Sequence, residues 1–205
     1  VAPPVFDFWA ARFDRLWTWE RPLARLVEPE GHSLLSDCRR RFGGADPRQQ
    51  RIFLRQAKAD AQVDRALCIS TTLEAFPGVH RLALEHDNFW ATVGVHPDNE
   101  GVREPTADEL VELAGLPRVV GIGETGLDYY RLGDRSAAEM EWQRERFRVH
   151  IRAARRTGKP LVIHTRSASA DTLAILREEG GGEVGGVFHC FTETREVARA
   201  ALDLG

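Results

Sequence analysis

Cysteine is scarce in this sequence of 205 residues, and its three cysteines, Cys38, Cys68 and Cys190, lie far apart along the chain. No CxxC pair is present, so the pattern does not indicate a disulfide scaffold. Few, scattered thiols are typical of proteins from a reducing compartment. We therefore expect a cytoplasmic protein.

Long apolar runs are also missing, since none approaches the roughly 18 residues that a membrane span needs. The first residues show no basic region followed by an apolar core, so no secretory signal is indicated. Charge of one sign is not in excess, because 28 Lys and Arg face 31 Asp and Glu. We expect no membrane partner, and contact with nucleic acid would need a local basic patch.

The sequence is rich in short apolar runs that do not alternate with polar residues. Such runs of Val, Ile and Leu are typical of strands that are buried on both faces of a parallel sheet. Five of them follow one another, at residues 66–69, 89–95, 119–122, 161–163 and 186–188. The spacing leaves room for a helix between successive strands, which predicts a βα repeat.

Helix start signals fall between these strands. Thr106 with Glu109, and Ser136 with Glu139, form the pattern of a capping box. The second box opens the longest helix, which should end at Gly158-Lys159-Pro160. Further helices are predicted after Asp46-Pro47, over 172–179 and over 193–202.

The first 33 residues differ from the rest. They carry Trp9, Trp17 and Trp19 but no strand-like run, and apolar residues recur at helical spacing from Phe6 onward. We expect an atypical extension over residues 1–33, either a helix packed on the body or an irregular segment. A helix that binds a partner or a membrane surface is the alternative.

Four consecutive predicted strands end in a side chain that can bind metal. His96, Glu124, His164 and His189 each stand at or just after the end of an apolar run. In a βα barrel the carboxyl ends of the strands converge on the face where catalytic residues collect. Any one of these histidines could be structural, but four equivalent positions predict a shared metal site.

Imidazole and carboxylate ligands suit Zn²⁺, Mn²⁺ or a related divalent ion. Such an ion lowers the pKa of a bound water and polarises a phosphoryl or carbonyl oxygen, so hydrolysis is the expected chemistry. Cys190 follows His189 directly. A strand that points His189 into the barrel directs Cys190 the opposite way, so we expect Cys190 to serve packing.

Gly121, Gly123 and Gly126 match the G-x-G-x-x-G pattern of dinucleotide-binding folds. Glu124 would place a negative charge against a pyrophosphate, and the residues after Gly126 do not open a helix. We therefore interpret these glycines as positions where strand and loop approach closely.

Four segments, in order and at familiar separations, resemble the TatD family of metal-dependent deoxyribonucleases, which belongs to the amidohydrolase-like barrels. These segments are residues 94–97 (GVHP), 123–130 (GETGLDYY), 163–166 (IHTR) and 189–191 (HCF). Gln143 and Phe147 on the long helix fit as well. The resemblance implies a TIM-like (β/α) barrel that cleaves DNA phosphodiesters, often as a 3′ exonuclease, with Mg²⁺, Mn²⁺ or Zn²⁺ and up to two ions.

The resemblance also implies roles for individual residues. Glu124, His164 and His189 would be metal ligands, with Glu124 also catalytic. Asp128 and Arg166 would act in catalysis, as phosphate contacts or as partners of the ligands. His96 would lie in the second shell of the metal site.

Two features of the family pattern are missing. The family opens with a strand that ends in His-x-His, and residues 34–40 contain no histidine, although His32 and Asp37 lie close by. The late strand that ends in a ligand aspartate is absent too. We therefore expect residues 34–205 to form a barrel of about five to six of the eight βα units, truncated at its C-terminus. Because the chain begins with Val1, it resembles a piece of a longer protein.

Three functions remain open. The first is a phosphodiesterase acting on DNA or another phosphate-bearing substrate, with activity impaired by the missing ligands. The second is an inactive remnant or interaction protein, and the third is a metal-dependent hydrolase of another small ester or amide. The first is favoured by Arg166 and by the arginines of the long helix, Arg144, Arg148, Arg152, Arg155 and Arg156.

Overall fold

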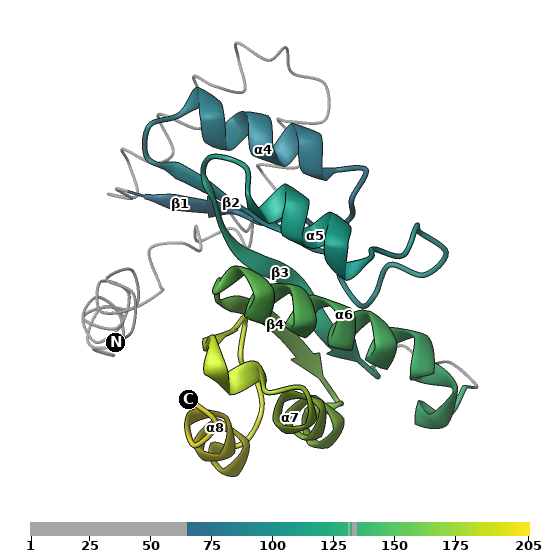
Figure 1. Ribbon diagram of the computed structural model, residues 1–205. Coiled ribbons are helices and arrows are strands. Elements are labelled where there is room, and N and C mark those ends of the chain that lie inside the picture. The colour runs from purple at the N-terminus through teal and green to yellow at the C-terminus, as the bar shows by residue number, and fades with distance from the viewer. Residues whose placement is uncertain (1–64, 131, 133–134) are drawn as a thin grey trace, which may run out of the picture. The chain divides into compact units, whose positions relative to one another are not determined.

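The described part of the chain is built on a parallel, curled sheet of five strands in sequential order, β1-β2-β3-β4-β5 (Figure 1). The computed structural model describes residues 65–130, 132 and 135–205. The strands are β1 (Ala66–Cys68), β2 (Phe89–Val93), β3 (Val119–Asp128), β4 (Leu161–Arg166) and β5 (Gly186–Phe188). This curled sheet is part of a barrel, which confirms the expected incomplete α/β barrel. The predicted extension over 1–33, the domain start at 34 and the helix after Asp46 lie outside the described residues.

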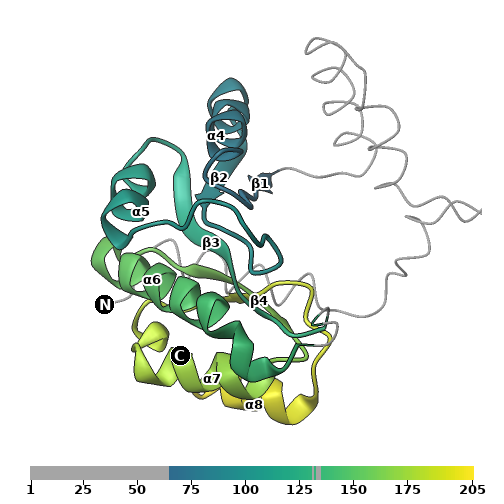
Figure 2. The ribbon, with the colours of Figure 1, turned by 90° about the vertical axis from the view of Figure 1, so that its right-hand side faces the viewer.

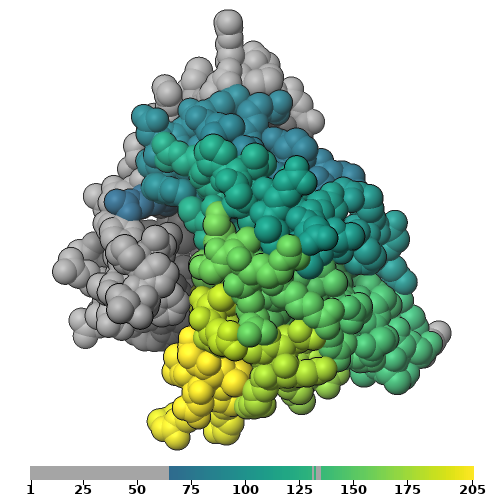
Figure 3. All heavy atoms as spheres, viewed as in Figure 1, coloured from purple at the N-terminus to yellow at the C-terminus, as the bar shows by residue number. Residues whose placement is uncertain are grey.

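A helix follows each strand. These helices are α4 (Phe76–Glu85), α5 (Ala107–Ala114), α6 (Glu141–Thr157), α7 (Ser169–Glu178) and α8 (Arg195–Leu202). Two short 3-10 turns, η2 (Ala137–Met140) and η3 (Gly181–Glu183), precede α6 and β5. Helices α4, α5 and α6 cover one face of the sheet in both ribbon views (Figures 1 and 2). In the space-filling view, α5 and α6 lie side by side over this face (Figure 3).

All five predicted strands are present, but β3 and β4 run further than expected. Their pairing continues to Asp128 opposite Arg166, although both strands carry polar residues in this stretch. Helix α4 was not predicted. Its N-cap is Ala75, which offers no side-chain acceptor, so the start signal for a helix is missing there.

The hydrophobic core lies between the sheet and its helical layer. On α6 the expected apolar face is confirmed, because Met140 before it and Phe147, Ile151 and Ala154 on it are all buried. The helix ends at Gly158, which has φ 64°, a left-handed conformation suited to glycine. At its start the Ser136 backbone N–H donates to Glu139 Oε2 at 2.7 Å.

Polar residues on the buried side of α6 hold the segment that follows β2. Buried His150 accepts the Val95 backbone N–H at Nε2 (3.0 Å) and donates from Nδ1 to the Arg146 carbonyl (2.7 Å). The Arg146 guanidinium, 2% exposed, donates to the His96 carbonyl at 2.9 Å and pairs with Glu104. These contacts fix the backbone on both sides of His96.

None of the helices in residues 65–205 that the structure describes is both long and apolar enough to cross a bilayer.

The buried imidazole of His150 generates a prediction for stability against pH. Burial lowers the pKa of His150 from 6.5 to about 4, so the unfolded chain takes up this proton at a higher pH than the folded protein. The contribution to the free energy of unfolding is therefore complete above pH 6.5 and is lost as the pH falls toward 4. The loss should be on the order of 3 kcal/mol.

We expect His150→Gln, which keeps an acceptor for Val95 but does not titrate, to flatten this dependence in urea unfolding measured across that pH range. His80→Gln should keep the dependence of the unmodified protein, because His80 bonds only the Pro117 carbonyl at an exposed site. Equal slopes for His150→Gln and the unmodified protein would contradict the assignment.

Candidate metal centre

Four neighbouring parallel strands bring the predicted side chains to one edge of the sheet. Glu124 lies in β3 and His164 in β4, whereas His96 and His189 follow β2 and β5. Glu124 stands at an irregularity in the ladder, since Gly123 pairs with Val162 and Thr125 pairs with Ile163, the next residue of β4. An extra residue of this kind redirects a side chain at the point where it occurs.

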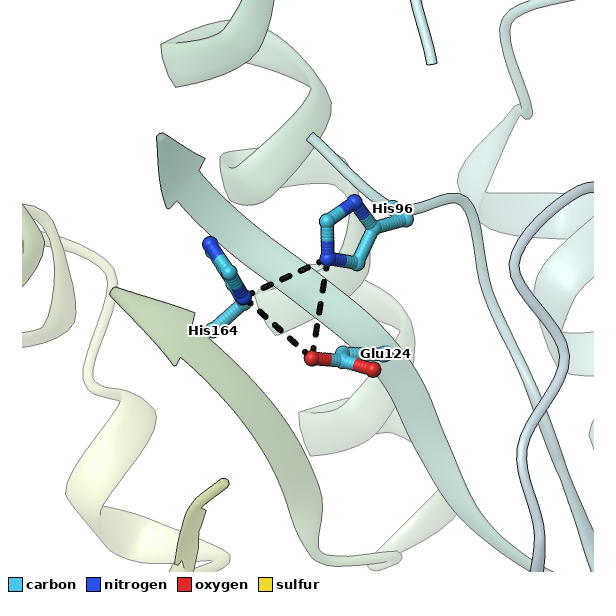
Figure 4. A group of neighbouring side chains, drawn as sticks. All are labelled: His96, Glu124 and His164. Atoms are coloured by element: carbon cyan, nitrogen blue, oxygen red, sulfur yellow. Dashed lines mark hydrogen bonds and ion pairs between the residues drawn. The ribbon is translucent and has the colours of Figure 1, made fainter. Parts of the chain in front are cut away.

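The Glu124 carboxylate is the centre of the cluster. Its Oε1 lies 3.2 Å from His189 Nδ1, 3.3 Å from His164 Nδ1 and 3.6 Å from His96 Nε2. Glu124 is 7% exposed, so this carboxylate is almost removed from water. Figure 4 shows the side chains of His96, Glu124 and His164 pointing toward one another.

His164 is oriented from its far side by Asp128. The His164 Nε2–H donates to Asp128 Oδ2 at 3.0 Å, so in the neutral ring the lone pair is on Nδ1, which lies 3.3 Å from Glu124 Oε1. Asp128 is in turn held by Gln143 of α6, which bonds both its backbone N–H (2.9 Å) and its carbonyl (3.2 Å). A carboxylate behind a histidine is the usual support for a metal-binding imidazole.

His96 is oriented in the opposite sense. Its Nδ1 accepts the backbone N–H of Asp98 at 3.1 Å, so the neutral ring carries its proton on Nε2. That Nε2 lies 3.2 Å from His164 Nδ1. His96 therefore presents a hydrogen-bond donor to the cluster.

His189 is the most accessible member, with a side chain 45% exposed. The prediction that Cys190 serves packing is wrong. It is exposed, has φ 46° and brings its Sγ to 3.7 Å from His189 Nε2. Strand β5 ends at Phe188, so the alternation on which that prediction depended does not extend to Cys190.

The charges of the cluster are coupled. Burial raises the pKa of Glu124. Hydrogen bonds from His164 and His96 and the charges of His96 and His189 lower it by more, so the net pKa of Glu124 lies well below its usual range. Burial lowers the pKa of His164, but its bonds to Glu124 and Asp128 raise it more, so the net pKa is raised. Glu124 is therefore an anion at neutral pH.

The donor set fits a divalent cation. Ligand atoms of His96, Glu124 and His164 lie within 4.8 Å of one another, and within residues 65–205 no other set of three metal-binding side chains does so where the structure is described. His189 contacts Glu124 at 3.2 Å but does not form such a set with Glu124 and His164. One anionic oxygen with several imidazole nitrogens suits Zn²⁺ or Mn²⁺. His32 and Asp37 lie outside the described residues.

The basic face of α6 is not a phosphate site. Its arginines are paired with carboxylates of α5, α6 itself, α7, η3 and the residues that flank them, among them Arg152 with Glu179 at 2.6 Å, Arg155 with Glu183 at 2.8 Å and Arg156 with Asp108 at 2.7 Å. These charges are neutralised on the outer face. Of the arginines considered for contact with a phosphate, only Arg166 lies at the end of a central strand.

The three glycines of the G-x-G-x-x-G pattern lie within β3, as the close-approach interpretation predicts. A Cβ on Gly126 would stand 2.0 Å from the His164 carbonyl oxygen, and one on Gly123 would stand 2.4 Å from the Val162 carbonyl oxygen. Both glycines have positive φ, 132° and 142°. They let β4 approach β3 where the cluster is assembled.

Sequence reasoning did not assign roles to several supporting residues. Gln143, Arg146 and His150 are buried polar residues on a helix whose buried face is otherwise apolar. That interruption of the apolar stripe was the available signal. Backbone carbonyls of the segment after β1 also contribute, since Ser70 accepts the Glu124 N–H and Thr71 accepts the His96 N–H, and no sequence pattern marks such contacts.

Comparison with known proteins places the chain among metal-dependent hydrolases. The family model described as TatD related DNase matches residues 41–205. The chain is 46% identical over 151 residues to the uncharacterized metal-dependent hydrolase YcfH of Escherichia coli K12, which covers 73% of this chain and 55% of YcfH. It is 34% identical over 147 residues to the 3'-5' ssDNA/RNA exonuclease TatD of Shigella flexneri, covering 71% and 55%.

Among solved structures, the chain is similar to YJJV, a TatD homologue from Escherichia coli K12. The TM-score is 0.65 at 23% identity, with 78% of this chain and 61% of the other chain covered. This similarity supports the barrel fold. The chain spans about half the length of the curated relatives it matches.

The support that Asp128 gives to His164 can be tested by metal binding. Asp128→Asn removes the charge behind the imidazole, and we expect the affinity for Mn²⁺ to fall about 10- to 100-fold in calorimetric titration. Asp171→Asn is the matched control, since Asp171 bonds Tyr129 Oη and does not contact the cluster. Equal affinities for Asp128→Asn and Asp171→Asn would show that Asp128 has no such role.

Proposed function

Because this chain belongs to the family of TatD-related DNases, we propose that it hydrolyses phosphodiester bonds of DNA with the help of a bound divalent ion. The observation that carries the proposal is the convergence of three imidazoles on the buried carboxylate of Glu124. The chain covers 55% of YcfH, so the activity of the whole protein belongs to the proposal.

We assign the metal-binding role to Glu124 Oε1, His164 Nδ1 and His189 Nδ1. The hydrogen bond from His164 Nε2–H to Asp128 supports this assignment, because it places the proton of the neutral ring on Nε2 and the lone pair on Nδ1. His96 is assigned a different role, because its Nδ1 accepts the Asp98 N–H and its Nε2 therefore carries the proton. In this arrangement His96 donates a hydrogen bond to the substrate or to a ligand.

Glu124, His164 and His189 would hold a divalent ion, which would supply a bound water of lowered pKa and polarise a phosphoryl oxygen. The residues of the chain supply the rest. Glu124 contributes a full negative charge in a nearly dry environment, where electrostatic effects are strong. The Nε2–H of His96 is available to a non-bridging phosphate oxygen or to the leaving oxygen, and such a positioned donor stabilises charge that develops in the transition state.

A phosphate-bearing substrate is favoured by Arg166. It ends β4 two residues after His164, and its guanidinium makes no ion pair with a carboxylate in the described segments. An unpaired arginine beside a metal centre suits a phosphate, which it can bind through two hydrogen bonds. The naming of one relative as an exonuclease of single-stranded DNA and RNA agrees with nucleic acid as the substrate.

Glu124→Gln tests the proposal. The change removes the anionic ligand while keeping size and shape, and we expect metal-stimulated cleavage of a labelled oligonucleotide to fall by about 100-fold or more, since even supporting residues of metal sites typically contribute 10- to 100-fold. The measurement is product release against time with Mn²⁺ or Mg²⁺ and, in parallel, with EDTA.

Glu145→Gln is the control, because Glu145 is an exposed partner of Arg148 and Arg152 on the outer side of α6. It should cleave at the rate of the unmodified protein. Cleavage that persists in EDTA or in Glu124→Gln would refute the metal-dependent mechanism. Glu124-dependent hydrolysis of a carboxylic ester or amide, with no cleavage of DNA, would instead identify a different hydrolase on the same scaffold.

A further inference from the structure

Tyr130 is an exposed aromatic side chain beside the metal centre. Among the described residues four large apolar or aromatic side chains are strongly exposed, and Tyr130 is 62% exposed. The other three, Leu84, Leu116 and Leu202, lie on α4, after α5 and on α8. Tyr130 alone among them follows the carboxyl end of a strand.

The backbone of Tyr130 is tied directly to the cluster. Its N–H donates to Asp128 Oδ1 at 2.9 Å, while Oδ2 of the same carboxylate accepts from His164. One carboxylate therefore orients a proposed metal ligand and fixes the start of the segment that carries the ring. The backbone of Tyr130 is therefore fixed by the same side chain that orients His164.

A cation covers one face of this ring. The guanidinium carbon of Arg166 lies 3.6 Å from the centre of the Tyr130 ring, and Asp128 and Arg166 are opposite each other in the β3–β4 ladder. With one face occupied and 62% of the residue exposed, the remaining surface of the ring is open to solvent. A flat π surface and a cation that has no carboxylate partner among the described residues thus stand together, at the ends of β3 and β4.

We propose that Tyr130 forms a stacking platform for a nucleobase near the scissile phosphate, with Arg166 on the other face of the ring as a contact for the phosphate backbone. The proposal rests on the proposed function, because it takes a nucleic acid as the substrate. Bases stack on aromatic side chains without regard to sequence, since every base has a π face. Arginine beside the ring adds attraction for both the ring and the phosphate backbone.

The proposal can be tested by an experiment that distinguishes binding of the nucleobases from binding of the phosphate backbone. Binding is measured by fluorescence anisotropy in the Glu124→Gln background, where cleavage does not interfere. The probes are a short single-stranded thymidine oligonucleotide and the same oligonucleotide with abasic positions throughout. We expect the Glu124→Gln protein, the parent of the variants below, to bind the thymidine probe more tightly than the abasic probe.

Adding Tyr130→Ala should weaken binding of the thymidine probe about 5- to 100-fold and leave binding of the abasic probe within about 2-fold. Tyr130→Phe keeps the ring and should bind like the parent. Leu116→Ala, an exposed change after α5, is the matched control and should have no effect on either probe.

The proposal would be overturned if Tyr130→Ala weakened the binding of both probes equally. It would also be overturned if this change left the affinity for the thymidine probe unaltered. A parent that does not discriminate between the two probes would overturn it as well. The proposed function fails separately, if the unmodified protein shows no metal-stimulated cleavage while the preference for the base-bearing probe persists.

Discussion

The structure depends on how a carboxylate is kept ionised where water has almost no access. Glu124 is 7% exposed, and an isolated charge in such a place would be strongly unfavourable. Three imidazoles surround this carboxylate, each delivered by a different strand or by the residues that follow it. Their N–H donors and, where a ring is protonated, its positive charge stabilise the anion. The charge of one residue therefore sets where three other segments must lie, and the same convergence creates a ligand set for a cation.

The approach of β3 and β4 makes this convergence possible. Gly123 and Gly126 have positive φ and face carbonyl oxygens of β4 at distances that leave no room for a Cβ. The extra residue in the ladder at Glu124 turns its side chain toward the cluster. Behind the strands, the side chains of Gln143 and His150 of α6 accept backbone N–H groups at the end of β3 and just after β2. Helix α6 thus fixes the positions of the carboxyl ends of β2 and β3, where the cluster lies.

Much of this arrangement could be predicted from the sequence, because apolar runs and the residues after them are local features. The five strands, the long helix and the grouping of His96, Glu124, His164 and His189 follow from that pattern. The length of β3 and the irregularity at Glu124 do not, since they depend on contact with β4, about 40 residues away in sequence. The glycines were the visible sign of that contact.

Other differences have the same origin. The arginines of α6 resembled a basic surface because several of their partners are distant in sequence, among them Glu179 and Glu183, some 25 to 30 residues later. Cys190 was predicted to pack because strand alternation was extended beyond Phe188, where β5 ends. The tautomer of His96 depends on one backbone N–H, that of Asp98. In each case the decisive neighbour is defined by the folded chain.

The central claim is that Glu124, His164 and His189 hold a divalent ion while His96 donates a hydrogen bond. A crystal structure with Mn²⁺, analysed by anomalous scattering, tests it most directly. The account predicts a peak roughly 2.0 to 2.2 Å from Glu124 Oε1, His164 Nδ1 and His189 Nδ1, with His96 Nε2 beyond bonding distance of the ion. A peak bonded to His96 Nε2 but not to His189, or no peak beside Glu124, would contradict it.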